Sequence, residues 1–160
     1  MPVHEEERLL DFLRRGLRYY QQQHLQAILS EPTEAAPYTA LILRLNEIGR
    51  RNASIDLEIG FVPGLDEAAG EGVYLMQTFA IVEASVDPAR HAQLWPVINE
   101  INITLPLGAY GIFEQERTIF FKHNSMWQRD TLEHELAVMY MDRQNGMILH
   151  QLHQYIDMLR

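Results

Sequence analysis

Residues 106–127 constrain the fold more than any other stretch of the chain. Two runs rich in aromatic and β-branched residues, 109–113 and 118–121, flank the polar residues 114–117. This pattern predicts a β-hairpin closed by a short polar loop. Apolar residues occupy both faces of each run, because side chains alternate between the two faces along a strand. We therefore expect helices on one face of the hairpin, and a second layer, a second subunit or a partner on the other.

The length and composition of the chain bound its class. A chain of 160 residues is long enough for one domain, which we place at residues 1–160. The lack of cysteine excludes a disulfide framework and thiolate metal ligands. No apolar run approaches the roughly 20 residues that span a bilayer, and the start of the chain is acidic where a secretory signal is basic. We expect a cytoplasmic protein without a membrane partner.

The chain is acidic, with a formal net charge of −9 at pH 7. Such a charge repels the phosphates of nucleic acids and of anionic lipids. Arginines cluster at positions 14, 15 and 18 and again at 50 and 51, and we interpret these clusters as solvated faces or a helix-end charge. We therefore expect no nucleic-acid partner.

Periodicity predicts the elements before the hairpin. Apolar residues at helical spacing predict a first helix over residues 4–29. Residues 38–45 fit either a helix or a buried strand, and the turn and alternating strand that follow, at 49–52 and 53–61, favour a strand. A third strand is predicted at 73–82. Asp87 and Pro88 predict a helix start, and Pro96 predicts a kink or a later start near Trp95.

The segment after the hairpin has the pattern of a helix. Asp130 and Glu133 form a variant of the capping box at its start. Asn145 and Gly146 separate two apolar stripes, which favours a break between two helices over one long helix. The predicted order is α-β-β-β-α-β-β-α. This order is typical of an α+β fold with a mostly antiparallel five-stranded sheet and helices packed on one face.

An acidic chain of this length and element order resembles the type III secretion chaperone-like fold, which includes the YbjN-like bacterial regulators. The segments that carry the resemblance are the predicted helix at 4–29, the strands at 38–45, 53–61 and 73–82, the helix after Asp87, and the hairpin at 108–127. The resemblance implies a small acidic homodimer that binds a segment of another protein without performing chemistry. The extended C-terminal helical segment departs from this pattern, and no individual site residue is transferred.

Seven histidines raise the question of a metal site. His150 and His153 lie three residues apart on the predicted helix and can present two imidazoles to one ion, with His134 as a third candidate. The zinc-protease pattern fails, because Val138 stands where a second histidine would follow His134. Solvated histidines on helix faces are the simpler interpretation, so we expect no metal and no cofactor.

The sequence contains no pattern that predicts a catalytic residue. The glycines at positions 60, 64, 70 and 72 are followed by a predicted strand, whereas a phosphate-binding loop leads into a helix. The serines lie outside the nucleophile-elbow pattern. We therefore predict no catalytic residue.

Large apolar side chains are the remaining candidates for a functional role. Tryptophan anchors many protein interfaces, although aromatic residues at strand or helix spacing are also ordinary core residues. The residues that we predict to form an interaction surface are Trp95, Tyr110, Ile112, Phe120 and Trp127.

Two functional hypotheses of different classes follow, and a third, a subunit of a larger assembly, differs from the first only in its partner. The first is a non-enzymatic protein-binding module, chaperone-like or regulatory, that acts as a homodimer on a protein partner or client segment. The alternative is a small metal-dependent hydrolase or small-ligand-binding protein that uses His134, His150 and His153.

Overall fold

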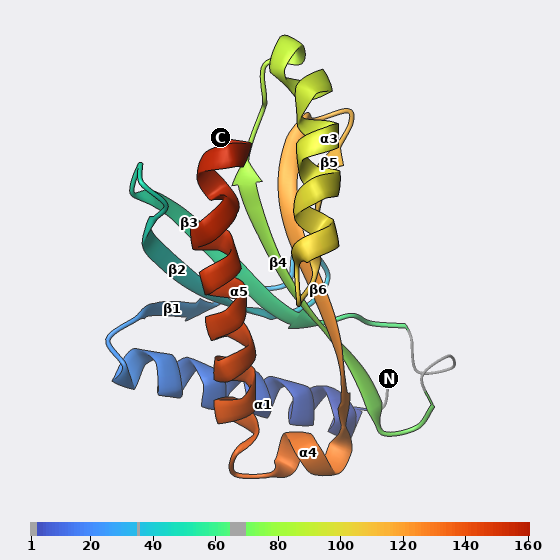
Figure 1. The fold of residues 1–160 in the computed structure, drawn as a ribbon. Helices are drawn as coiled ribbons and strands as arrows, with labels where there is room; N and C mark the ends of the chain where they lie inside the picture. Colours follow the sequence, from blue (N-terminus) through green and yellow to red (C-terminus); the bar gives the residue numbers. More distant parts are fainter. Residues whose placement is uncertain (1–2, 35, 65–69) are drawn as a thin grey trace.

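The computed structural model describes residues 3–34, 36–64 and 70–160 of the chain (Figure 1). In chain order its elements are α1 (Val3–Gln22), β1 (Gln26–Leu29), β2 (Ala40–Ile48), β3 (Ala53–Phe61), β4 (Val73–Glu83), α3 (Pro88–Thr104), β5 (Ala109–Phe113), β6 (Thr118–Gln128), α4 (Arg129–Glu133) and α5 (Ala137–Leu159). The α+β class and the antiparallel sheet are confirmed. The sheet has six strands rather than five, and the element order is α-β-β-β-β-α-β-β-α-α, so the finer prediction is wrong.

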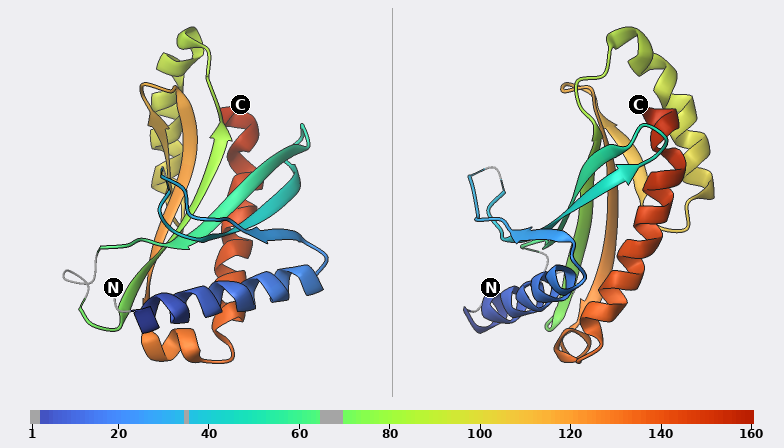
Figure 2. Two further views of the ribbon diagram at one scale, coloured as in Figure 1. Left: turned by 180° about the vertical axis from the view of Figure 1, so that it is seen from behind. Right: turned by 90° about the vertical axis from the view of Figure 1, so that its left-hand side faces the viewer.

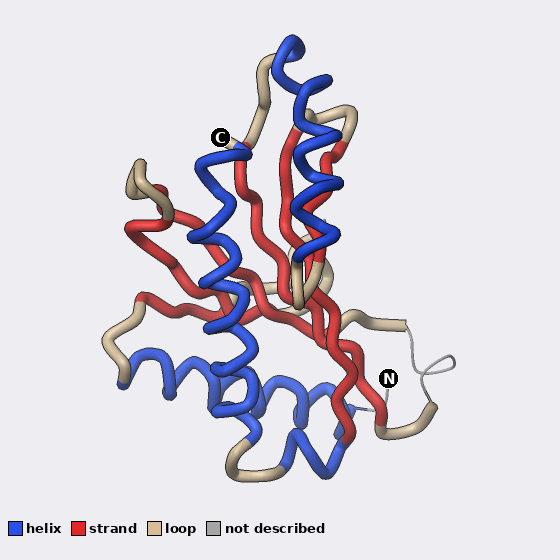
Figure 3. The backbone as a smooth tube through the Cα atoms, in the orientation of Figure 1, coloured by secondary structure: helices blue, strands red, loops and turns tan. Residues whose placement is uncertain are grey.

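The strands form one sheet in the order β1-β2-β3-β4-β6-β5, and every neighbouring pair is antiparallel. β4 and β6, with 11 residues each, are its longest strands and pass behind α3 and α5 in Figure 3. The predicted hairpin is confirmed, because β5 pairs with β6 from Ala109 opposite Lys122 to Phe113 opposite Thr118. Residues 114–117 make its turn.

The helices pack on one face of the sheet. The right-hand view of Figure 2 shows α3 and α5 on one side of β4 and β6, while the strongly twisted sheet continues over α1 near β1 and β2. Phe12 of α1 contacts Phe61 of β3 and Trp127 of β6, with ring centroids 5.9 and 5.4 Å apart. We call this side the helix-covered face and the opposite side the helix-free face.

The first helix is shorter than predicted. It ends at Gln22, and the residues that follow turn through His24, which has a positive φ of 61°. Residues 26–29 form β1, which pairs with β2 and lies beside α1. Leu25 and Ile28 continue the helical spacing of α1, but both are exposed, whereas Ala27 of β1 is buried. Pairing with β2 therefore decides the conformation here.

The C-terminal segment breaks at residues 134–136 and not at Asn145 and Gly146. α5 is continuous through both residues. Asn145 is buried and its Nδ2 donates to the Tyr20 hydroxyl at 2.9 Å, so its side chain packs on α1 instead of ending the helix. The predicted capping box is also wrong, since the residue before α4 is Gln128, which makes no side-chain cap, and Glu133 instead pairs with Arg8 at 2.5 Å.

The start of α3 agrees with the prediction. Asp87 caps the helix by accepting the backbone N–H of Ala89 at 2.8 Å, and Pro88 is the first helical residue. The helix passes through Pro96 and reaches Thr104, so a later start near Trp95 is excluded.

Candidate functional site

The helix-free face carries a row of outward-pointing residues that crosses the whole sheet. Strand register places its members directly opposite one another on neighbouring strands. From one edge to the other the row consists of Ile28, Ile42, Glu58, Phe79, Lys122 and Ala109. Each of the two charged residues, Glu58 and Lys122, therefore lies between apolar residues along one line of the sheet, with Phe79 near its centre.

An aromatic cluster occupies this face over β4, β6 and β5. It consists of Phe79, Phe113 and Phe120. The ring of Phe120 stacks on that of Phe113 at 4.3 Å and on that of Phe79 at 5.7 Å. Ile81, which is opposite Phe120 on β4, extends the apolar surface. Phe113 remains 43% exposed and Ile81 41% exposed. The cluster is therefore ordered by its own stacking while a large part of it stays in water.

A glycine allows the cluster to lie flat on the sheet. Gly111 of β5 pairs with Phe120 of β6. A Cβ atom added at Gly111 would lie 2.9 Å from Cε1 of Phe120 and closer still to its Cζ. An aromatic ring that covers a strand glycine in this way replaces the side-chain packing that the glycine lacks.

Two opposite charges flank Phe79 in the row. Glu58 lies on β3 on one side and Lys122 on β6 on the other. Glu58 is half-buried, and this burial, together with the negative charge of Asp56, raises the pKa of its carboxyl group. Within residues 3–34, 36–64 and 70–160, neither Glu58 nor Lys122 has an ion-pair partner. Both are free to pair with a bound partner.

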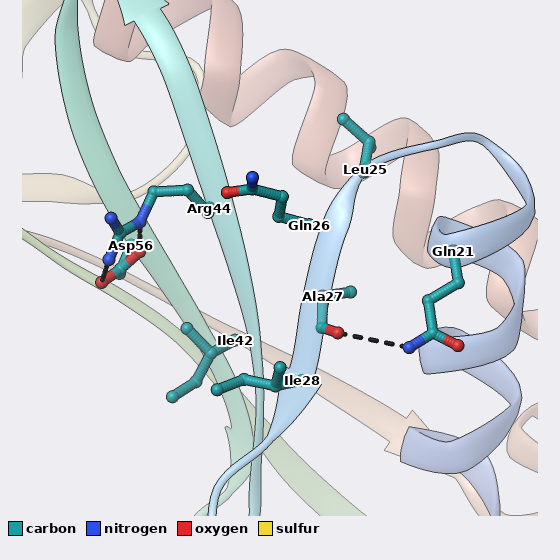
Figure 4. Close-up of a pocket in the computed structure, with 8 residues that line it drawn as sticks. All are labelled: Gln21, Leu25, Gln26, Ala27, Ile28, Ile42, Arg44 and Asp56. Carbon is teal, nitrogen blue, oxygen red and sulfur yellow. Dashed lines mark hydrogen bonds and ion pairs between the residues drawn. The ribbon is translucent and has the colours of Figure 1, made fainter.

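A groove of about 560 Å³ lies at the β1 end of the same face (Figure 4). Its apolar wall is formed by Ile28 and Ile42. Its polar wall is formed by Arg44 and Asp56, which are joined in a bidentate ion pair with one N···O distance of 2.7 Å. Because these two charges satisfy each other, the groove offers packing surface more than free charge.

The structure divides the five predicted interaction residues. Tyr110, Ile112 and Trp127 are buried on the helix-covered face, at 3%, 7% and 6% exposure, so in this structure their side chains belong to the core. Phe120 belongs to the aromatic cluster. Trp95 is exposed on α3, where its Nε1 donates to Glu114 at 3.1 Å. Whether these two bind a partner stays a prediction.

The candidate metal ligands are not brought together. His134 lies between α4 and α5, and its Nδ1 accepts the backbone N–H of Leu136 at 3.2 Å. His150 and His153 lie on α5, about 20 and 24 Å beyond its first residue at 1.5 Å per helical residue. Nδ1 of His153 accepts the backbone N–H of Gly49 at 3.2 Å. Across the described part of the chain, no three His, Cys, Asp or Glu residues are arranged to hold a metal ion.

Sequence reasoning missed most of the helix-free face. The sequence shows that the strands carrying Phe79, Ile81 and Phe113 are apolar on both faces. The alternation of side chains alone does not say which of these faces the helices cover. The signal was available in the neighbouring strand, because Asp56 and Glu58 mark the wet face of β3. Only the register of β3 with β4 shows that Phe79 shares that face.

The open edge of β5 is capped by a side chain. Asn102 of α3 donates from Nδ2 to the Tyr110 carbonyl at 2.9 Å and accepts the Tyr110 N–H at 2.8 Å. Its amide therefore bonds this residue as a neighbouring strand would. Gln151 of α5 binds Leu107 in the same way, at 2.7 and 3.1 Å. These contacts make strand addition at this edge unfavourable.

No protein-family model matches the chain, and no curated protein is significantly similar to it in sequence. The resemblance to the type III secretion chaperone-like fold therefore stays an expectation. Among the described helices, none has the length and apolar character needed to cross a membrane.

Proposed function

We propose that this chain is a non-enzymatic protein-binding module, chaperone-like or regulatory, that acts as a homodimer. Its binding surface is the helix-free face of β4, β6 and β5. The single observation that carries the proposal is the partly exposed aromatic cluster of Phe79, Phe113 and Phe120, with Ile81 beside it.

The energetics of this surface favour a protein partner. Removal of apolar surface from water is favourable by about 25 cal/mol per Å² before the costs of association are subtracted. Aromatic side chains contribute disproportionately to such interfaces, since they bury a large area with little loss of conformational freedom. Stacking already orders the rings of the cluster, so a partner meets a surface that is largely preorganised.

The surrounding charges support the same role. Glu58 and Lys122 border the apolar surface without partners among the described residues. Charged groups around an apolar centre are typical of protein interfaces, where they set the register and orientation of the partner. A module of this kind holds or regulates another chain by contact alone.

Site-specific photo-crosslinking tests the proposal. A benzophenone amino acid is placed at Phe113, in the cluster, and at Ile103, an apolar residue of α3 that is 84% exposed. Both variants are irradiated in cells of the source organism. The proposal predicts a covalent adduct with a protein from position 113 and much less adduct from position 103.

The mass of the adduct identifies the partner class. An adduct of twice the chain mass indicates a second copy, and any other defined mass indicates a client. Equal or absent adducts from the two positions would contradict the proposal.

A further inference from the structure

We propose that the partner on the helix-free face is a second copy of this chain, packed sheet against sheet, with the two-fold axis running along β4. This inference rests on the proposed function and adds to it the identity and orientation of the partner. It is carried by the order of side chains in the row that crosses the sheet.

The row is self-complementary about Phe79. Glu58 lies one strand away on one side of Phe79, and Lys122 lies one strand away on the other. A two-fold axis parallel to β4, placed between two facing sheets, exchanges these two sides. Glu58 of one copy then faces Lys122 of the other copy, and the reverse pair forms by symmetry. The apolar Phe79 residues meet near the axis.

The other in-plane orientation of the axis is unfavourable. An axis in the plane of the sheet but perpendicular to the strands would place each strand of one copy opposite the same strand of the other copy. Glu58 would then face Glu58, and Lys122 would face Lys122. Like charges that face each other at an interface are repulsive, and this arrangement would leave the half-buried Glu58 without a cation. The charge pattern therefore selects the axis along β4.

The size of the surface fits a dimer. Eleven-residue strands extend for about 36 Å, and the four strands β3, β4, β6 and β5 cover about 19 Å across, so the face offers roughly 600 Å² per copy. Stable protein interfaces bury about 800 Å² per partner. Outward side chains of the neighbouring strands β1 and β2, such as Ile28 at 61% exposure, can supply the remainder.

The β5 edge of the sheet favours face-to-face packing of two sheets over pairing of their edge strands. The β5 edge is occupied by the Asn102 amide, which blocks its extension by another strand. A two-fold axis along β4 keeps the two β4 strands nearly parallel, within the roughly 30° that is typical of aligned sheet packing, so the middle of each β4 strand faces its mate. Phe79 and Ile81 lie there on the outward side of β4.

Charge reversal tests both the partner and the axis. The variants are Glu58→Lys, Lys122→Glu and the double variant that carries both changes. The controls are Glu116→Lys and Arg51→Glu, which alter the net charge equally at exposed turn positions. Sedimentation velocity over a concentration series gives the dimer dissociation constant, and circular dichroism confirms that each variant is folded.

The expected result is a dimeric wild-type protein whose dissociation constant rises by at least about tenfold in each single variant, because both ion pairs become repulsive. The double variant restores dimerisation to within about threefold of wild type, since the pairs are re-formed with reversed sign. An equimolar mixture of the two single variants also forms a dimer. This mixture remains informative if one variant is only moderately stable. The control variants dimerise like wild type.

Four results would overturn the inference. A dimer that is insensitive to both single charge reversals would place the interface or the axis elsewhere. A double variant weaker than either single variant would exclude the Glu58–Lys122 pairing. A wild-type chain that stays monomeric while position 113 cross-links to a different protein would reject the second copy and the dimeric state, but it would leave the protein-binding role of the helix-free face standing. A lack of any adduct at position 113 would remove both.

Discussion

The ring of Phe120 covers Gly111 on the neighbouring strand, and it lies so close that a Cβ atom at Gly111 would come within 2.9 Å of Cε1. The same ring stacks on Phe113 and Phe79. One glycine thus sets the height at which the aromatic cluster lies above the sheet. The geometry of the helix-free face depends on this contact.

The Gly111→Ala variant tests that dependence. The added methyl group must displace the Phe120 ring and disturb its stacking, so we expect a loss of about 1–3 kcal/mol in the free energy of unfolding. We also expect weaker self-association. Urea denaturation and sedimentation velocity measure the two effects. A variant as stable and as dimeric as wild type would show that the ring moves aside without cost.

The Gly146→Ala variant is the matched control and a prediction in its own right. Gly146 lies inside α5, and a Cβ atom there would meet no neighbour within 4 Å. Alanine has a higher helix propensity than glycine, so we expect stabilisation by up to about 1 kcal/mol. The same urea denaturation series measures it. Destabilisation would mean that the helix is interrupted at this point, as the sequence pattern had indicated.

Asn102→Asp tests the capping of the β5 edge. A carboxylate can still accept the Tyr110 N–H, but it cannot donate to the Tyr110 carbonyl, which it would instead repel. We expect a loss of about 1–3 kcal/mol in the free energy of unfolding. Asn99→Asp, at an exposed position on the same helix, controls for the added charge. Equal stability of the two variants would contradict the role assigned to Asn102.

The Glu58→Gln variant tests how much the half-buried carboxylate of Glu58 destabilises the folded monomer. Burial raises the pKa of Glu58 in the folded state. The folded state therefore binds its proton more tightly than the unfolded state, and stability falls as the pH rises from below the unfolded pKa through the folded pKa. We expect Glu58→Gln to be more stable than wild type at pH 7, with the difference vanishing near pH 4.

Thermal denaturation between pH 4 and pH 7, at concentrations where both proteins are monomeric, measures this difference. A difference that does not depend on pH would show that the carboxylate is not destabilised by burial. Under dimeric conditions the same substitution is expected to weaken association, because it removes the charge that faces Lys122.

Strictly local patterns were enough to predict part of this fold. β3 begins and ends as predicted, since Ile55, Leu57 and Ile59 alternate with polar residues and the sheet keeps one of its faces wet. The start of α3 follows from the side chain of Asp87 and the ring of Pro88 alone. Such features depend on neighbouring residues and not on the rest of the chain.

The remaining features depend on contacts between distant residues. β1 continues the helical spacing of α1, and only its pairing with β2 makes it a strand. α5 continues through Gly146, because packing of its stripe on the sheet outweighs the low helix propensity of glycine. The burial of Tyr110 and the exposure of Phe113 have the same origin, because the positions of α3 and α5 decide which side of β5 is buried.

The measurement that tests the central claim most directly is the distance between identical positions in two copies of the chain. The chain has no cysteine, so one cysteine at Leu75 or at Ile81 can be spin-labelled uniquely. Both residues point outward from β4, about 20 Å apart along the strand. Pulsed electron paramagnetic resonance is predicted to give a short distance between the two spin labels of a dimer, and nearly the same distance for the two labelled positions. Distances that differ by more than about 10 Å would contradict the axis along β4, and a lack of dipolar coupling at both positions would contradict the pairing of the helix-free faces.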